Sequence, residues 1–462
     1  MEPLVMIRIN EKDNVSVDPT TGHKYAICDI CKGEFVIKYG YPIGKATCDI
    51  KEGEHVHIHN LSSYISENEE YTYNEETDRI NYTESSRTFP AYIRKSGDIG
   101  IRNDIWIVPT VGCVNGIATE LARITGSKAL THPYGCSQLS DDFRITRKTL
   151  ANIILHPNAG GVLVLGLGCE NNNIESLKQF IKEYDEERIG FLNCQDCEDE
   201  LVEGVKIINE IKTIANSDIK RPVPISKLRV GLKCGGSDGL SGITANPLVG
   251  DFTNRLVSVG GTCVLTEVPE MFGAERILMN RCKDRETFLK TVALINGFKS
   301  YFVSHGQPIN ENPSPGNKDG GITTIEEKSL GCIQKAGCAE VNDVLDYGEI
   351  VKEKGLSLLN GPGNDIVSIT NLFQASCHLI LFTTGRGTPL GSFIPTVKIS
   401  SNRKLATNKP AWIDFDASPI LDGAELGDIF FEYVLSVASG EKTKNEISSF
   451  NEIAIFKDGV IL

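Results

Sequence analysis

The sequence predicts an α/β protein with parallel sheets, preceded by a small domain rich in β-strands. Two observations support this fold class. From about residue 105 onward, short apolar runs recur, each followed by a glycine-rich turn and then by a stretch with helical periodicity. Before residue 61, in contrast, the apolar segments are short, are bounded by Gly or Asp, and show no helical period.

The small domain is expected over residues 1–72. We predict its strands at 25–27, 34–38 and 55–58, separated by turns at the glycines 33, 40, 44 and 53. A polar stretch rich in Ser, Asn, Glu and Thr follows from 62 to 86. We place a linker over residues 73–95 on this change of composition.

The remainder is expected to form two Rossmann-like α/β regions, over residues 96–230 and 231–462. The predicted strands are 105–108, 161–165, 228–231, 263–265 and 378–382, and the predicted helices are 114–124, 174–184, 247–259 and 267–275. Residues 310–321 are rich in Pro, Gly and Asn, and we expect them to form an irregular loop.

Composition restricts the possible partners. The chain has 462 residues, 61 acidic and 47 basic, so its formal net charge is −14. Without clustered Lys and Arg, we expect no nucleic-acid partner. No apolar run approaches the ~20 residues of a membrane span and no signal sequence is seen, so we expect a cytoplasmic protein without a membrane partner. The 14 cysteines are expected to be reduced thiols rather than disulfides.

The loops after the predicted strands carry candidate functional residues. Ligands of α/β sheets bind at the carboxyl ends of the strands, where helix N-termini favour anions such as carboxylates or phosphates. The alternative is that each loop is only a tight turn. The side chains in these loops are Cys113, Cys136, Cys169, Glu170, Cys234, Ser237, Asp238, Glu267 and Arg386.

Cysteines in four of these loops are further candidates. Each would lie beside a helix N-terminus, which favours a thiolate, and an iron–sulfur cluster bound by them stays open. They are Cys113, Cys136, Cys169 and Cys234. The two Cys-x-x-Cys pairs, Cys28/Cys31 and Cys194/Cys197, are interpreted as incidental thiols.

Histidines cluster at residues 53–60 (GEHVHIHN). If this segment is a strand, its alternation places His55, His57 and His59 on one face, where they could bind a cation or line a polar cleft. His23 is a further candidate in the same small domain. A solvated histidine face is the alternative.

Several longer motifs are specific enough to indicate a family. They are residues 110–115 (TVGCVN), 132–138 (HPYGCSQ), 155–161 (LHPNAGG), 166–170 (GLGCE), 233–247 (KCGGSDGLSGITANP), 266–275 (TEVPEMFGAE), 312–318 (NPSPGNK) and 382–389 (FTTGRGTP). From about residue 13 to residue 402 the chain resembles the altronate dehydratase family, which includes galactarate dehydratase and sulfolactate sulfo-lyase. Residues 22–24 (GHK), 38–40 (KYG) and 55–60 (HVHIHN) look like the small SAF domain of these enzymes. One stretch departs: residues 94–98 read RKSGD where the family has Arg-x-Asp-Gly-Arg.

The resemblance implies a hydro-lyase that dehydrates a sugar acid, D-altronate, to 2-dehydro-3-deoxy-D-gluconate. It also implies a divalent metal, Fe²⁺ or alternatively Mn²⁺. Removing a proton beside a carboxylate creates an enediolate-like dianion, which needs a cation or several hydrogen-bond donors to form. We expect the substrate to be the protein's small-molecule partner and the protein to be a homo-oligomer.

Roles are assigned as hypotheses. The catalytic candidates are His23, His57 and Asp238; the substrate-binding candidates are Ser137, Gly235, Gly236, Ser237, Lys318 and Arg386; the metal candidates are His23, His55, His57, Cys136 and Glu170. His23 would act as general base or metal ligand, and Arg386 or Lys318 would bind the substrate carboxylate.

Three alternatives are kept. The first is a dehydratase or lyase of another hydroxy acid, galactarate-like or sulfolactate-like. The second is a sugar-acid-binding protein without catalysis. The third is a nucleotide-dependent oxidoreductase, which is disfavoured because residues 166–170 (GLGCE) lack the third glycine of a dinucleotide fingerprint.

Overall fold

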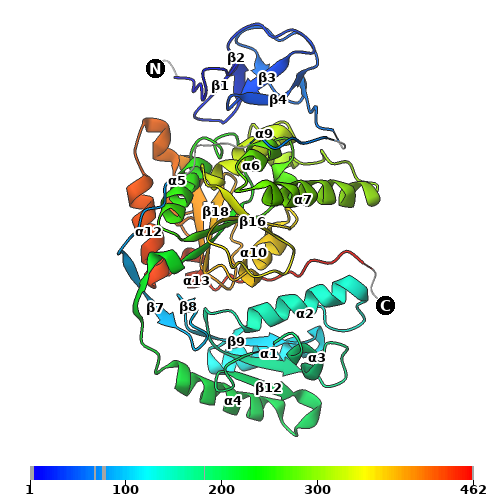
Figure 1. Ribbon diagram of the computed structural model, residues 1–462, viewed down its shortest axis with the longest axis vertical. Helices are drawn as coiled ribbons and strands as arrows, with labels where there is room; N and C mark the ends of the chain where they lie inside the picture. The colour runs from blue at the N-terminus through cyan, green and yellow to red at the C-terminus, as the bar shows by residue number, and fades with distance from the viewer. Residues whose placement is uncertain (1–4, 67–68, 75–79, 182, 460–462) are drawn as a thin grey trace.

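The computed structural model describes residues 5–66, 69–74, 80–181 and 183–459. Figure 1 shows three parts along the longest axis: the N-terminal domain at the top, the C-terminal domain in the middle, and a second domain, which contains β9–β12 and α1–α4, at the bottom. In the described part of the chain, no helix has the length and apolar character that crossing a membrane requires.

The N-terminal domain consists of two small antiparallel sheets. One has the order β1 (Val15–Val17), β2 (Lys24–Ala26), β5 (His55–Val56), and the other has the order β3 (Phe35–Lys38), β4 (Tyr41–Ala46), β6 (Leu61–Ser62). Alternating apolar residues of these strands form its core, including Val15, Val36 and Ile43.

The predicted strand 55–58 is shorter than expected. It ends at Val56, because the Asn60 side chain accepts a hydrogen bond from the His57 amide and donates one to the carbonyl of His55. These contacts form a turn in place of an extended strand.

A three-stranded antiparallel sheet lies between the second and C-terminal domains. Its order is β13 (Arg221–Pro224), β7 (Thr88–Ile93), β8 (Ile99–Gly100). Strand β7 therefore occupies part of the predicted linker 73–95, because its alternating Phe89 and Ala91 are buried in the core. Residues 75–79 of that linker lie outside the described residues.

The second domain has a four-stranded parallel sheet. Its order is β10 (Lys128–Ala129), β9 (Asp104–Pro109), β11 (Ala159–Gly166), β12 (Ile189–Asn193), and its helices are α1 (Asn115–Thr125), α2 (Ser140–Ile154), α3 (Ile174–Lys178) and α4 (Glu200–Ala215). The predicted helix 174–184 is wrong in length. After Lys178, Phe180 and Ile181 make turn-like bonds to residues three positions earlier.

The C-terminal domain has a seven-stranded parallel sheet. Its order is β16 (Val341–Leu345), β17 (Gly355–Leu359), β15 (Thr262–Leu265), β14 (Arg229–Cys234), β18 (Leu379–Thr384), β19 (Thr396–Ser400), β20 (Phe415–Asp416). The helices are α5 (Ala245–Ser258), α6 (Glu275–Asn280), α7 (Arg285–Ser304), α8 (Pro315–Asp319), α9 (Ile325–Cys332), α10 (Asp365–Gln374), α11 (Arg403–Asn408), α12 (Gly427–Ser439) and α13 (Lys444–Ser448). The predicted fold class, a small β-rich domain followed by α/β regions with parallel sheets, is confirmed.

Two local predictions in this domain are wrong. Residues 267–275 do not form one helix: Glu267 has a φ of +72°, and a 3₁₀ turn, Val268–Met271, precedes α6. The segment 310–321 contains α8, whose start is stabilised by a capping box between Ser314 and Asn317.

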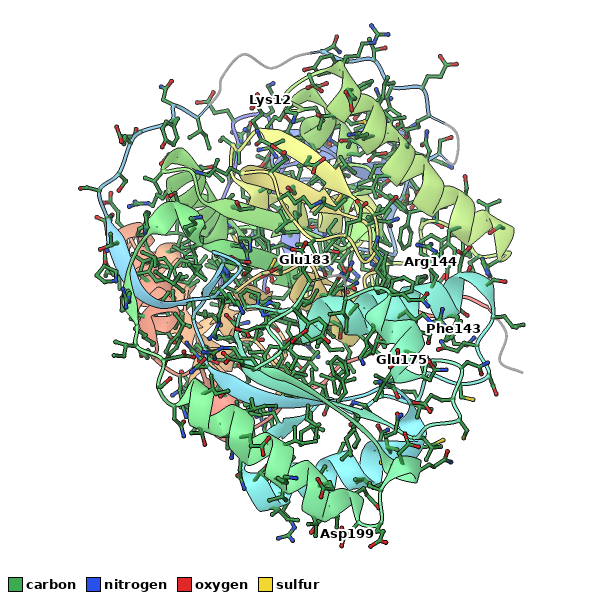
Figure 2. All side chains as sticks on the ribbon, turned by 60° about the horizontal axis from the view of Figure 1, so that its bottom comes forward. Lys12, Phe143, Arg144, Glu175, Glu183 and Asp199 are labelled. Carbon is green, nitrogen blue, oxygen red and sulfur yellow. The ribbon has the colours of Figure 1, made fainter. Side chains whose placement is uncertain are left out.

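The acidic charge is carried largely on outer faces. In Figure 2, Glu175 of α3 and Asp199, which caps the N-terminus of α4, lie at the exterior of the second domain. Both residues are exposed. The net charge therefore does not describe the interior, where charged side chains occur in specific clusters.

Candidate active site

A polar cleft of about 1100 Å³ lies between the N-terminal and C-terminal domains. The N-terminal domain contributes His23 and the turn before it. The opposite wall comes from loops that follow β14, β18 and β19, at the carboxyl edge of the seven-stranded sheet. Residues of this wall include Asp238, Gly320, Gly385, Arg386 and Asn402.

Glycine backbones bring the two domains into contact beside the cleft. A Cβ atom on Gly239 would lie 2.0 Å from the carbonyl oxygen of Gly22, and one on Gly321 would lie 2.5 Å from the same oxygen. Gly239 also donates a backbone hydrogen bond of 2.7 Å to the carbonyl of Gly320. Since no side chain fits between these backbones, the glycines fix the turn that carries His23.

A buried charge triad also joins the two domains. Glu327 of α9 pairs with Lys24 of β2 at 2.8 Å and with Lys38 of β3 at 2.9 Å, and all three side chains are almost fully buried. Burial alone would raise the pKa of Glu327, but the two lysines hold it well below its usual range. Burial lowers the pKa of Lys24 to about 8, despite its contact with Glu327.

The histidine cluster comprises His23, His55, His57 and His59. His23 Nδ1 lies 3.0 Å from His55 Nε2, the rings of His55 and His57 stack with centroids 5.3 Å apart, and His57 Nε2 lies 2.9 Å from the carbonyl oxygen of Lys318. Burial and the neighbouring histidines lower the pKa of His55 to about 4, and burial lowers that of His57. Both rings are therefore neutral at neutral pH.

The opposite wall positions a carboxylate. Asp238 Oδ1 accepts hydrogen bonds of 2.8 Å from the hydroxyls of Ser241 and Ser401, and Oδ2 accepts one of 2.9 Å from Asn402. The Arg386 amide donates to the carbonyl of Gly236, which joins the loops after β14 and β18. Asp238 is thus held rigidly by its hydrogen-bond donors.

The structure brings many predicted site residues to this cleft and separates others from it. Those at or beside the cleft are His23, His55, His57, Gly235, Gly236, Ser237, Asp238, Lys318 and Arg386. Ser137, Cys136 and Glu170 belong to the second domain, at the opposite end of the molecule in Figure 1. Glu170 there accepts hydrogen bonds from the Thr110 hydroxyl and from the amides of Leu167 and Gly168. The predicted metal set of three histidines, Cys136 and Glu170 is therefore not assembled.

The departing segment 94–98 has contacts away from the cleft. Arg94 donates to the Pro157 carbonyl and to Asn103, while Asp98 forms a bidentate pair with Arg229. Arg94 also lines a separate cavity of about 410 Å³ beside His156 and Arg188. This segment connects domains and does not line the cleft.

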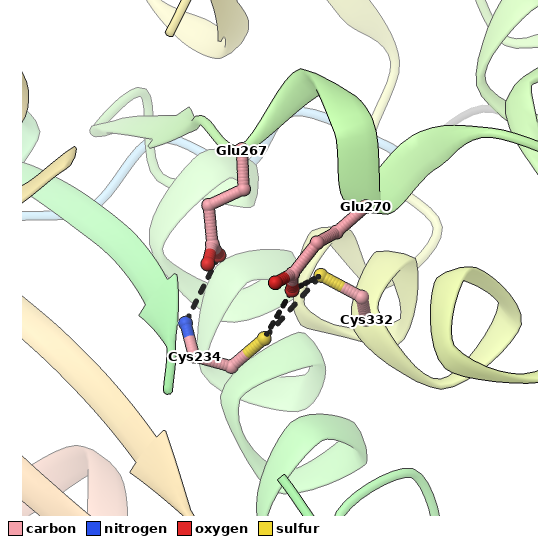
Figure 3. A group of neighbouring side chains, drawn as sticks. All are labelled: Cys234, Glu267, Glu270 and Cys332. Atoms are coloured by element: carbon pink, nitrogen blue, oxygen red, sulfur yellow. Dashed lines mark hydrogen bonds between the residues drawn. The ribbon is translucent and has the colours of Figure 1, made fainter. Parts of the chain in front are cut away.

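A second polar cluster lies beneath the carboxyl end of β14. Cys234, Glu267, Glu270 and Cys332 are fully buried and offer ligand atoms within 4.8 Å of one another (Figure 3). The two sulfur atoms are 3.4 Å apart, and Glu270 Oε2 lies 3.2 Å from Cys234 Sγ. Cys234 and Glu267 were among the candidate residues predicted in the loops, whereas Glu270 and Cys332 were not. The signal for Cys332 was the charged segment 326–335 (EEKSLGCIQK) around it, and the signal for Glu270 was its place in the motif 266–275 (TEVPEMFGAE).

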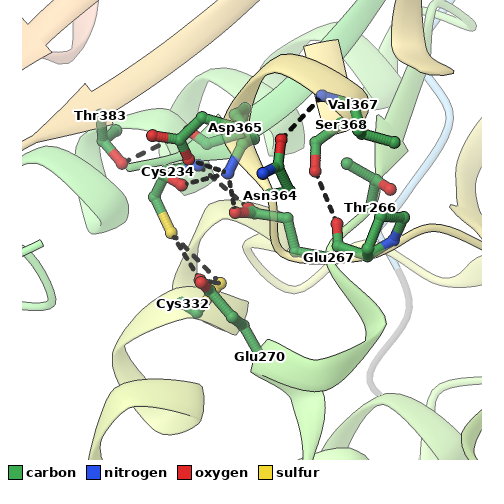
Figure 4. A network of polar contacts seen from close by, with 12 residues as sticks. Cys234, Thr266, Glu267, Glu270, Cys332, Asn364, Asp365, Val367, Ser368 and Thr383 are labelled. Atoms are coloured by element: carbon green, nitrogen blue, oxygen red, sulfur yellow. Dashed lines mark hydrogen bonds and ion pairs between the residues drawn. The ribbon is translucent and has the colours of Figure 1, made fainter. Parts of the chain in front are cut away.

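Three lysines neutralise this cluster. Lys233 pairs with Glu267 and with Asp365, two carboxylates that Figure 4 shows on the same side of the network. Lys335 lies 3.4 Å from Glu267, and Lys328 lies 2.9 Å from Glu270. Burial acts to raise the pKa of Glu270, but the lysines lower it to about 2. Three carboxylates thus face three ammonium groups, and a cation entering here would have to displace lysines.

Comparisons with known proteins agree with this domain organisation. Residues 17–64 match the altronate/galactarate dehydratase SAF domain, residues 91–216 the second domain of D-galactarate dehydratase/altronate hydrolase, and residues 225–461 the C-terminal domain of D-galactarate/altronate dehydratase.

Curated relatives match nearly the whole chain. An altronate dehydratase of Bacillus subtilis (strain 168) is 50% identical over 99% of this chain and 94% of the relative. An altronate dehydratase of Escherichia coli (strain K12) is 49% identical over 98% and 94%, respectively. A galactarate dehydratase (L-threo-forming) of the same E. coli strain is 30% identical over 94% and 89%.

Proposed function

We propose, on the premise that the chain belongs to the altronate/galactarate dehydratase family, that it is a hydro-lyase for a sugar acid, D-altronate. The product would be 2-dehydro-3-deoxy-D-gluconate plus water. The observation that carries this proposal is the cleft, in which histidines of one domain face an arginine and a glycine-rich loop of another. The cytoplasmic location and the homo-oligomeric state stay predictions from the sequence.

The wall formed by the C-terminal domain suits the substrate carboxylate. Arg386 can bind a carboxylate through two parallel hydrogen bonds, and Lys318 adds a point charge. Ser237 lies in the adjoining loop with Gly235 and Gly236. A Cβ atom on Gly235 would lie 2.6 Å from Phe382, and Gly236 has a φ of +62°, so these glycines fix the loop that carries Ser237. Asp238 acts as a positioning residue, because it fixes Ser401 and Asn402 in the same wall.

Proton abstraction is assigned to His23. It is the member of the histidine cluster that lines the cleft, and its contact with the neutral His55 holds its ring in place. His23 would take the proton from C2, the hydroxyl at C3 would leave as water, and the resulting enol would become the 2-keto acid. His57, fixed by the Lys318 carbonyl, supports the arrangement.

The histidine cluster offers neutral imidazole groups to the divalent cation that the family resemblance implies. A metal binds neutral imidazole, and the low pKa values of His55 and His57 keep both rings in that form. His55 and His57, beside His23, would hold Fe²⁺ or Mn²⁺. When bound, the cation would supply positive charge that stabilises an enediolate and a departing hydroxyl.

Anaerobic turnover by the purified full chain with Fe²⁺ tests the function. D-altronate, galactarate and sulfolactate are offered separately, and 2-keto acid or sulfite is measured. We expect the highest kcat/KM with D-altronate. Binding of D-altronate without any product would contradict the proposal and support a sugar-acid-binding protein.

A variant tests the role of His23. His23→Gln should lower kcat by about 10²–10⁴-fold, the range for loss of a general base, while its metal content stays at the level of the unmodified protein. His305→Gln, an exposed histidine that contacts Asp458, is the control. Joint loss of metal and activity in His23→Gln would assign the residue as a ligand, and normal turnover would overturn both roles.

A further inference from the structure

The second domain presents cysteines at the carboxyl ends of all four of its parallel strands. Cys113 follows β9, Cys136 follows β10, Cys169 follows β11, and both Cys194 and Cys197 follow β12. Because the strands are parallel, these loops meet at one edge of the sheet. We call Cys113, Cys136 and Cys169, which are all exposed, the cysteine edge.

Backbone hydrogen bonds tie the cysteine-bearing loops to one another. The Gly112 amide donates a hydrogen bond of 2.9 Å to the Tyr134 carbonyl, and the Asn172 amide donates one of 2.9 Å to the Gly135 carbonyl. These bonds join the loop after β9 to the loop after β10, and that loop to the one after β11. The cysteines therefore lie on neighbouring, mutually fixed segments.

Side chains add contacts at the sulfur atoms themselves. Cys136 Sγ lies 3.3 Å from Asn171 Oδ1, and this oxygen also accepts from the Ser137 amide at 3.1 Å. Gln195, in the loop after β12, places its Nε2 3.5 Å from Cys169 Sγ. Contacts thus run from the second loop to the third and from the third to the fourth.

Each cysteine of the edge directly follows a glycine that the loop requires. Gly135 has a φ of +107° and Gly168 a φ of +124°, and a Cβ on Gly135 would lie 2.1 Å from the Thr110 carbonyl. A Cβ on Gly112 would lie 3.0 Å from the His132 carbonyl. The same Gly-Cys sequence occurs in three adjacent loops. Because packing alone does not require exposed thiols, this recurrence indicates a binding role for the cysteines.

The sulfur atoms of the cysteine edge do not all lie within reach of a single ion. A tetrahedral Zn²⁺ site with bonds of about 2.3 Å needs its sulfurs within about 4 Å of one another. In the described part of the chain, the group of ligand atoms within 4.8 Å of one another is the buried one at Cys234, and it contains no member of the cysteine edge. A cuboidal four-iron cluster holds its cysteine ligands farther apart, at its corners.

The surroundings also suit a cluster with negative charge. Arg147 of α2 donates to the carbonyl of Asn171, whose side chain contacts Cys136. Among the described residues, the Nε2 group of the buried Gln138, two positions after Cys136, has no hydrogen-bond acceptor. An N–H donor of this kind can serve a cluster sulfur. The fourth-loop thiol Cys194 is a poorer ligand, because burial and nearby acids raise its pKa to about 11.

We propose that the cysteine edge binds one [4Fe–4S] cluster through the thiolates of Cys113, Cys136 and Cys169. Three thiolates leave one iron without a protein ligand, and the exposure of the edge makes that iron accessible to water or a small oxygen ligand. Transfer of a preassembled [4Fe–4S]²⁺ cluster replaces three of its four small thiolate ligands by the three cysteines, and the fourth thiolate stays on the remaining iron until water takes its place and it leaves as the free thiol. Each cysteine proton passes to the thiolate that it displaces, and no electron is exchanged. Cys234, buried beside Cys332 in the C-terminal domain, takes no part.

The test supplies a preassembled [4Fe–4S]²⁺ cluster, carried by small thiols, to the full chain without oxygen. After desalting, iron, acid-labile sulfide and absorbance near 400 nm are measured. We expect about four iron and four sulfide per chain, with loss of the absorbance on exposure to air. Cys113→Ser, Cys136→Ser and Cys169→Ser should each retain at least about fivefold less sulfide.

Controls separate ligation from folding. Cys338→Ser and Cys28→Ser replace exposed cysteines outside the second domain and should retain the full amount. Thermal unfolding of each edge variant without cluster should match that of the unmodified chain. Absence of labile sulfide in the unmodified chain, bound metal without sulfide, or equal retention by edge and control variants would each overturn the proposal. None of these readouts depends on the proposed dehydratase activity.

Discussion

The two parallel sheets share an architecture and differ in what their carboxyl edges present. In the C-terminal domain, the loops after β14 and β18 carry Asp238 and Arg386, and the N-terminal domain covers them. In the second domain, the equivalent loops carry sulfur, and Cys113, Cys136 and Cys169 are exposed. Strand order and twist therefore do not fix the chemistry of such an edge. The few residues after each strand, and the presence of a covering domain, determine it.

The largest effect should come from removing the buried carboxylate that holds the N-terminal domain over the edge of the C-terminal sheet. Glu327→Gln leaves the buried ammonium groups of Lys24 and Lys38 without a carboxylate, which should cost about 3–5 kcal/mol. The N-terminal domain should then undock more often. We expect proteolytic cleavage between residues 60 and 90 to accelerate by more than about a hundredfold.

An exposed ion pair in the same domain provides the control for this change. Lys51 and Asp29 are 2.7 Å apart but largely exposed, so Asp29→Asn should leave the stability nearly unchanged. Equal cleavage rates for Glu327→Gln and Asp29→Asn would show that the buried triad does not hold the domains together.

A smaller effect should follow from separating the two walls of the cleft without removing a charge. Gly239→Ala places a Cβ 2.0 Å from the Gly22 carbonyl oxygen, so the turn with His23 must shift. A misplacement of about 1 Å can cost ~10²-fold in rate, and we expect kcat for sugar-acid dehydration to fall by about that factor. Unchanged kcat, with the circular dichroism spectrum retained, would show that the glycine contact does not position His23.

Low pH should loosen the cysteine edge. Burial lowers the pKa of His132 to about 4, and its Nε2 lies 2.8 Å from the Pro109 carbonyl at the end of β9. Since the folded pKa is below the unfolded value of about 6.5, the unfolded segment binds a proton that the folded one does not. The stabilisation is complete above pH 6.5 and falls by about 1.4 kcal/mol per pH unit down to pH 4.

Hydrogen exchange in residues 110–139 measures this loss. After correction for intrinsic rates, exchange by opening should be about fivefold faster at pH 5.5 than at pH 6.5. In the His132→Gln variant, exchange should not accelerate by this factor between pH 6.5 and pH 5.5. If it shows the same pH dependence as the unmodified chain, His132 is not the residue responsible.

The smallest effect is expected at the start of the helix after Cys113. A Cβ atom on Gly116 of α1 would have open space around it, with no packing neighbour among the described residues within 4 Å, and the φ of Gly116 is not positive. Gly116→Ala should therefore raise the free energy of unfolding by up to about 1 kcal/mol, because alanine favours the helix. Differential scanning calorimetry would show a small rise in Tm, and a fall would contradict the prediction. The same variant is the control for Gly239→Ala.

Local patterns predicted much of the fold and only part of the candidate site. The repeated apolar runs identified β9, β11, β14, β15 and β18 because buried parallel strands are continuously hydrophobic. The loops containing Asp238 and Arg386 followed from the same pattern. His55, His57 and His59 do not alternate along one strand, since β5 ends at Val56, yet the turn that follows still brings their rings together.

Contacts between distant segments were beyond such patterns. Glu327 pairs with lysines about 300 residues earlier in the chain, and Cys332 meets Cys234 only after the C-terminal sheet has formed. Cys136 and Glu170 were grouped with the histidines because their chemistry is compatible. The domain arrangement places the second domain, which contains Cys136 and Glu170, at the opposite end of the molecule from the N-terminal domain with the histidines.

The N-terminal domain is held over the cleft by its contacts with the C-terminal domain rather than by the peptide connection between them. Lys24, Lys38 and Glu327 supply its buried charge, and Gly22 meets Gly239 backbone to backbone. None of these contacts uses the peptide connection between the domains. The N-terminal domain and the rest of the protein, produced as two separate polypeptides, should therefore assemble on mixing into a functional complex. The enzyme could in this way be used as a split reporter.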